Sequence, residues 1–251
     1  MFGRGIKLFR VFGIQIELHW TFLLALLLWG VTGRLGFVAN LLLGLTVFGS
    51  VLVHELGHGL VALRRQVRIA GIELHFFGGV AKMVDLPRTP RDEIAIAVAG
   101  PLTSLVLAAL GGGLWWLSTL WWSNGLSALA WFAEVNLTLA IFNLLPALPM
   151  DGGRIFRAAL QTRLGGLRAT RIASHVARGF AVLLAGLGLW ADPFLLLLAV
   201  LLWTMAGQER KLAEWRYADL APDHGARPRI RIVLRDRLGR TTVIEDIGIR
   251  W

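Results

Sequence analysis

Two histidines four residues apart, His54 and His58, stand with Glu55 directly after the first of them. On a helix, residues i and i+4 lie on the same face, so both imidazoles would leave the helix together. Two neutral imidazole nitrogens can bind one zinc ion at about 2.0–2.1 Å, with the acidic residue beside the metal as a general base. The pattern therefore predicts zinc-dependent hydrolytic chemistry.

The surroundings of this motif are those of a membrane span. It lies in an apolar run from about residue 38 to 63, where ionisable side chains are costly and normally functional. The whole chain of 251 residues is 56% hydrophobic, and its mean hydropathy is +0.63. These values indicate an integral membrane protein. In a soluble helix the same short motif often arises by chance. Its position in a predicted membrane span makes a chance occurrence a weaker explanation here.

A catalytic zinc site needs a third protein ligand, and the chain contains no cysteine to supply one. The carboxylates near the predicted spans are Glu17, Asp85, Glu134 and Asp151. Asp151 fits best, because it follows a helix broken by prolines on the side where His58 also lies. Gly152 and Gly153 after it allow the backbone to turn back toward the metal.

Asn143 is a candidate donor to the oxyanion of a tetrahedral intermediate, since it lies two turns before Asp151 in an apolar span. Its alternative role is a hydrogen bond between helices, and Glu134 and Asn136 suit that role too. His75, in the segment after the second span, could approach the same site.

The elements that would carry these residues form an α-helical polytopic membrane protein. We expect about six transmembrane helices, near residues 19–31, 37–63, 94–117, 126–145, 172–190 and 194–205. A small interfacial β-hairpin or sheet would be formed by residues 67–84 and a short strand within 11–18. Residues 1–210 would be the catalytic domain, with its core about 37–163, and residues 211–251 a cytosolic tail with a possible β-hairpin.

The predicted membrane topology accounts for the net charge of +10. The basic residues gather in segments predicted on one side of the membrane, and Arg34 alone lies in a predicted outer loop. This pattern puts both termini in the cytosol, and we expect no nucleic-acid partner.

The motifs together resemble those of the site-2 protease family of intramembrane zinc metalloproteases. The second motif of that family is Asn-x-x-Pro-x-x-x-x-Asp-Gly, and residues 143–152 match it at every fixed position. Residues 77–80 and 99–101 resemble further family elements. The likeness spans about residues 11–210 and is to the six-span branch. The residues after 210 do not resemble the CBS-domain pair that often accompanies that branch.

This resemblance implies one Zn²⁺ per chain, held by His54, His58 and Asp151, with Glu55 catalytic and Asn143 assisting substrate binding or the oxyanion. It implies a multi-pass protein of a prokaryotic plasma membrane. Its partners would be the lipid bilayer and a transmembrane or membrane-anchored protein substrate, and a homo-oligomer is possible.

Two other functions use the same residues. A zinc transporter or sensor would keep the three ligands without proteolysis, and a silent scaffold would have no need of Glu55. The variant Glu55→Gln distinguishes a zinc transporter or sensor from a hydrolase, because only a hydrolase should lose its turnover when Glu55 is replaced. If the chain is a protease, the hairpin 67–84 offers an edge on which an extended substrate could add as a strand.

Overall fold

The computed structural model describes residues 5–33, 35–76, 78–122, 125–218, 232–235 and 241–244, so Arg34 and Phe77 lie outside the described residues. The chain forms two compact units, Met1–Glu214 and Trp215–Trp251. In the second unit, strands β5 (Ile232–Arg235) and β6 (Thr241–Ile244) pair antiparallel. A boundary at residue 210 and the role of the tail stay predictions.

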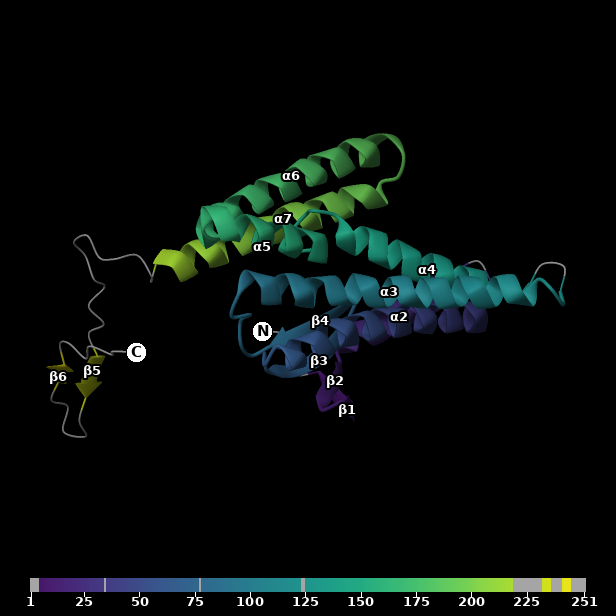
Figure 1. Cartoon of the computed structure of the whole chain (residues 1–251), viewed down its shortest axis with the longest axis horizontal. Coiled ribbons are helices and arrows are strands. Elements are labelled where there is room, and N and C mark those ends of the chain that lie inside the picture. Colours follow the sequence, from purple (N-terminus) through teal and green to yellow (C-terminus); the bar gives the residue numbers. More distant parts are fainter. Residues whose placement is uncertain are drawn as a thin grey trace. The chain divides into compact units, whose positions relative to one another are not determined.

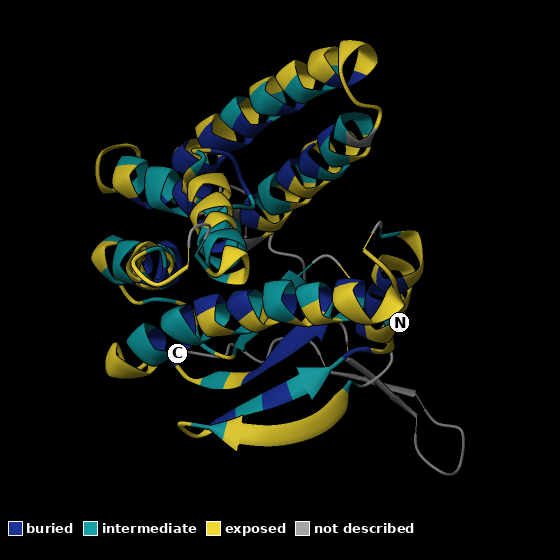
Figure 2. Cartoon of the chain, turned by 90° about the vertical axis from the view of Figure 1, so that its right-hand side faces the viewer, coloured by how far each residue is buried: buried dark blue, intermediate teal, exposed yellow. Residues whose placement is uncertain are grey.

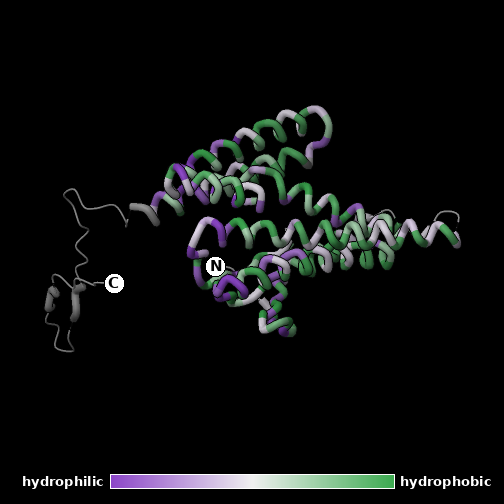
Figure 3. The backbone as a smooth tube through the Cα atoms, viewed as in Figure 1, coloured by the Kyte–Doolittle hydropathy of each residue, from purple (hydrophilic) through white to green (hydrophobic). Residues whose placement is uncertain are grey.

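Four described helices are long and apolar enough to cross a membrane (Figures 1 and 3). They are α2 (Phe37–Arg64), α3 (Pro90–Ser118), α4 (Ser127–Leu144) and α6 (Gly166–Trp190). Helix α3 packs against both α2 and α4. A helix satisfies its own backbone hydrogen bonds, which is what a membrane interior requires. The prediction of a helical membrane protein with a small sheet is confirmed at this level.

The six predicted spans are not all confirmed. Helix α1 (Trp20–Thr32) is apolar but has 13 residues, which rise only about 20 Å. Helix α7 (Phe194–Ala218) is longer, but its second half contains Gln208, Glu209, Arg210 and Lys211. Both helices exist where the sequence predicts them, yet their apolar parts are shorter than a bilayer core of about 30 Å.

A four-stranded sheet has the order β1-β2-β3-β4. Its strands are β1 (Ile6–Val11), β2 (Ile14–Leu18), β3 (Ile69–His75) and β4 (Gly78–Met83). Strands β2 and β3 run parallel, and the other two pairs are antiparallel. The predicted hairpin 67–84 is thus present as β3 and β4. Strand β1 was not predicted, because its mostly exposed residues resemble a basic tail.

The sheet lies against α2. Ile14, Ile16 and Ile72 are almost wholly buried and pack on Leu52 and Leu56 of that helix. Figure 2 shows buried positions on the inner strands of the sheet, whereas β1 is exposed from Ile6 to Arg10. The helix that carries the histidines is therefore held between the sheet and α3.

Two helix starts are well defined. The side chain of Thr89 caps α3 by accepting a hydrogen bond from the Asp92 N–H at 3.1 Å. Helix α5 covers Asp151–Leu164, so Asp151 is its first residue.

Candidate metal centre

Helices α2 and α5 bring three buried side chains together. Nε2 of His54 and Nε2 of His58 lie 3.2 Å apart, as their spacing on one helical face predicts. Oδ2 of Asp151 lies 3.2 Å from the His54 nitrogen and 3.0 Å from the His58 nitrogen. These three side chains, which we call the His–His–Asp cluster, are at most 6% exposed.

The other nitrogen of each imidazole is held by α3. Nδ1 of His58 lies 2.7 Å from the carbonyl oxygen of Ile96, to which it must donate its proton. Nδ1 of His54 lies 2.9 Å from the Ser104 hydroxyl, which is wholly buried. Such contacts fix the ring orientation and, for His58, leave a lone pair on the nitrogen that faces the cluster.

The partners on α3 follow a spacing of four residues. Ile96, Gly100 and Ser104 therefore share one face of the helix. A Cβ atom on Gly100 would lie 2.2 Å from Nε2 of His58 and 2.6 Å from Nε2 of His54, so glycine leaves the space that the two rings occupy. Neither Gly100 nor Ser104 was predicted to be a site residue. The signal available was their position on one face of an apolar helix.

The cluster fits a zinc ion. Bonds of about 2.0–2.1 Å in a tetrahedron place neighbouring ligand atoms about 3.3–3.4 Å apart, close to the observed separations of 3.0–3.2 Å. Two imidazoles and one carboxylate are also a usual ligand set for catalytic zinc, with the fourth position open.

The start of α5 passes very close to the end of α4. A Cβ atom on Gly152 would lie 2.2 Å from the carbonyl oxygen of Leu144, and one on Gly153 would lie 2.4 Å from the Leu148 nitrogen. The two glycines therefore permit close backbone contact within a helix, rather than the sharp turn expected from the sequence.

Glu55 connects the cluster helix to the sheet. Its Oε2 accepts a hydrogen bond from the Ala81 N–H of β4 at 3.2 Å. A Cβ atom on Gly79 of the same strand would lie 2.6 Å from Cγ of Glu55. The carboxylate beside the first histidine thus lies against an edge strand.

The other sequence candidates are not members of the His–His–Asp cluster. Asn143 donates to the carbonyl oxygen of Leu139 in its own helix at 2.9 Å. Glu17 pairs with Lys82 at 2.9 Å, and Asp85 pairs with Arg68 at 2.7 Å. These two carboxylates are therefore engaged by cations away from the cluster.

His75 belongs to a second group in the sheet, with His19 and Glu73. Nε2 of His75 lies 3.4 Å from Glu73, and the same carboxylate contacts Nζ of Lys82 at 2.5 Å. A cation of the chain itself thus pairs with the carboxylate of this group.

The chain is similar to known proteins over most of its length. It matches Peptidase family M50 over residues 42–121 and 115–187. A zinc metalloprotease of Methanocaldococcus jannaschii is 37% identical over 214 residues, which cover 84% of this chain and 62% of that protein. The protein Rip3 of Mycobacterium tuberculosis is 39% identical over 203 residues, covering 74% of this chain and 51% of Rip3.

Among solved structures, the site-2 protease from Methanocaldococcus jannaschii matches with a TM-score of 0.62 and 37% sequence identity. The match covers 82% of this chain and 95% of that chain. The present chain spans about half to two thirds of the length of the curated relatives named above.

Proposed function

Because this chain belongs to peptidase family M50, we propose that it is an intramembrane zinc metalloendopeptidase. It would hydrolyse peptide bonds in or near the transmembrane segments of membrane-protein substrates, either to release a regulator or to clear a remnant peptide. The observation that carries the proposal is the buried His–His–Asp cluster, with a glutamate directly after its first histidine.

In this proposal His54, His58 and Asp151 hold one zinc ion per chain. Zinc at such a site polarises a carbonyl oxygen and acidifies water. Glu55 takes the proton of the attacking water and later gives it to the leaving amine. Asn143 turns its amide from its own helix toward the substrate and donates to the oxyanion.

The edge strand β4 would align the substrate. It is the last strand in the sheet order, and its Ala81 N–H points away from β3 to Glu55. A peptide in a helix hides its amides in its own hydrogen bonds, so it must unwind before hydrolysis. Pairing with β4 would replace those hydrogen bonds and bring an extended segment to Glu55.

The finer membrane topology is also part of the proposal. Helices α1 and α7 would complete six spans, with local thinning of the bilayer or tilting of neighbours accommodating their short apolar parts. Both termini would then lie in the cytosol, as the distribution of basic residues favours. The membrane would be the plasma membrane of a prokaryote.

The test compares the wild type with Glu55→Gln in liposomes that contain single-span substrates. We expect the variant to keep its zinc and to lose about 100- to 10,000-fold in cleavage rate, because the general base is removed. Glu214→Gln, at a partly exposed ion pair on α7, is the matched control. Uncleaved substrate trapped on Glu55→Gln would identify natural partners. Equal cleavage by both proteins would reject the mechanism, and zinc transport without cleavage by either would favour the transporter.

A further inference from the structure

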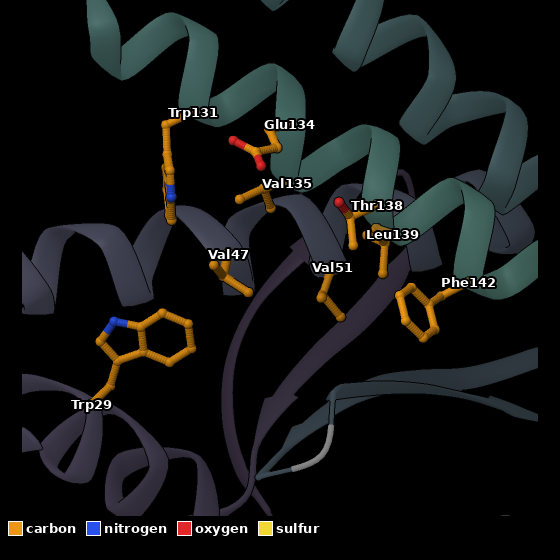
Figure 4. A pocket seen from close by; sticks show the side chains of 9 residues that line it. All are labelled: Trp29, Val47, Val51, Trp131, Glu134, Val135, Thr138, Leu139 and Phe142. Atoms are coloured by element: carbon orange, nitrogen blue, oxygen red, sulfur yellow. The ribbon is translucent and has the colours of Figure 1, made fainter. Parts of the chain in front are cut away.

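A groove of about 500 Å³ lies between α2 and α4 (Figure 4). Val47 and Val51 of α2 line one wall, and Thr138 and Phe142 of α4 line the other. Trp29 of α1 stands at one end. The lining is mostly apolar, and both helices that form it are long and apolar enough to cross a membrane. An apolar segment of another protein in the bilayer would find a complementary surface here.

One carboxylate lines this groove. Glu134 lies near the middle of the 18-residue α4, about 15 Å from its end at Leu144. The side chain is exposed, and within the described residues it has no hydrogen bond or ion pair. A carboxylate at this depth is costly, and in membrane proteins it normally has a polar or cationic partner. The described part of the chain supplies none.

We propose that this groove binds the transmembrane segment of the substrate and that Glu134 selects segments carrying a lysine or arginine at its level. The inference rests on the proposed function and adds the chemistry of the substrate to it. A lysine would neutralise the carboxylate, and its methylene stem would pack on Val47 and Val51. An all-apolar segment would leave Glu134 unpaired.

The groove is continuous with the place where cleavage is proposed. Val51 lies one helical turn before Glu55, and its Cγ1 is 3.3 Å from the Cβ position of Gly79 in β4. Val47, which Figure 4 shows on the wall across from Glu134, is eight residues before Glu55, or about 12 Å along α2. That length equals about eight helical or four extended residues of a substrate. The selected lysine should therefore lie four to eight residues from the cleaved bond.

The experiment moves a single lysine in one-residue steps through a single-span substrate, with leucine at the same position as the reference. Cleavage by the full chain in liposomes is measured as kcat/KM. For wild type we expect a maximum four to eight residues from the cleaved bond, with lysine favoured over leucine about tenfold there. Glu134→Gln should remove this preference, and Glu134→Lys should reverse it in favour of a substrate glutamate.

The matched control moves the carboxylate instead of deleting it. Leu137 is exposed on α4 and does not line the groove, so Glu134→Leu with Leu137→Glu keeps the charge of the helix but takes it out of the groove. This double variant should also lack the preference for a lysine in the substrate. Its survival in this double variant, or in Glu134→Gln, would overturn the proposal.

Binding is measured separately from cleavage, with a photo-crosslinker at Thr138 in a Glu55→Gln background. A higher yield with the lysine substrate than with the leucine substrate supports the groove. Crosslinks to lipid alone, or equal yields, overturn it. If wild type cleaves no substrate, the proposed function fails, whereas cleavage without a lysine preference overturns the groove alone.

Discussion

The main-chain N–H of Ala81 donates a hydrogen bond to Oε2 of Glu55 over 3.2 Å. This contact joins the outer edge of the sheet to the acid beside the His–His–Asp cluster. A peptide that added to β4 would need the same N–H, so it would compete with Glu55 for it. Substrate pairing and the release of the carboxylate for proton transfer would then be one event.

Gly79→Val should disturb this arrangement. Its Cβ atom would lie 2.6 Å from Cγ of Glu55, which would displace the carboxylate and obstruct the strand edge. We expect cleavage of an embedded substrate to fall about a hundredfold, the cost of a displacement of about 1 Å at a reacting group. Gly186→Val, at a position with open space on α6, should change little. Unchanged cleavage by Gly79→Val would end the edge-pairing hypothesis.

Gly100→Ala should prevent metal binding without preventing insertion of the helix. The added methyl would lie 2.2 Å from Nε2 of His58. The control is Gly113→Ala on the same helix, where nothing lies within 4 Å and alanine favours the helix. Zinc titration of both purified variants makes the comparison. Binding of zinc by Gly100→Ala with wild-type affinity would contradict the close packing of α3 on the cluster.

Ser104→Ala should weaken zinc binding about 10- to 100-fold, because the His54 ring loses the partner that orients it. Thr46→Ala is a suitable control, since the hydroxyl of this half-buried residue of α2 donates to the Leu42 carbonyl within its own helix. Competition with a zinc chelator of known affinity measures the zinc affinity of both variants. If the two variants bind zinc equally well, Ser104 does not position the ring.

The exposed pair Arg68–Asp85 predicts a pH dependence at the end of the hairpin. Hydrogen bonds from Arg68 lower the pKa of Asp85 from its ordinary 3.8 to about 2. The contribution to stability is therefore full above pH 3.8 and is lost as the pH falls through about 2. The difference in Tm between wild type and Asp85→Asn should be small at neutral pH, because the pair is exposed, and should close as the pH falls below about 2. A difference that grows on acidification would contradict this assignment.

The His–His–Asp cluster could be located from the sequence because its ligands are residue types that are rare in an apolar chain. Imidazoles four residues apart and a carboxylate after prolines are unusual in an apolar chain, and the resemblance to the site-2 protease family is confirmed. Ser104 carries no such signal, since serine is common between membrane helices, and Gly100 is marked only by the resemblance of residues 99–101 to a family element. Only the packing of α3 on α2 shows what they contact.

The number of spans was harder to predict than their existence. Hydropathy locates an apolar helix but does not measure how much of it lies in the bilayer, and α1 and α7 are both short in apolar length. Strand β1 was missed for a related reason. Its edge position leaves Ile6, Leu8 and Phe9 exposed, so no alternation of burial marks the strand.

The measurement that tests the central claim most directly is the zinc content of purified wild type, Asp151→Ala and Asp85→Asn, with substrate cleavage measured on the same samples. The proposed site predicts one zinc per chain and full cleavage for wild type and Asp85→Asn. It predicts loss of both for Asp151→Ala, because the cluster would lose its only carboxylate. If the Asp151→Ala variant retained zinc and cleaved substrate at the wild-type rate, this result would contradict the proposed metal centre.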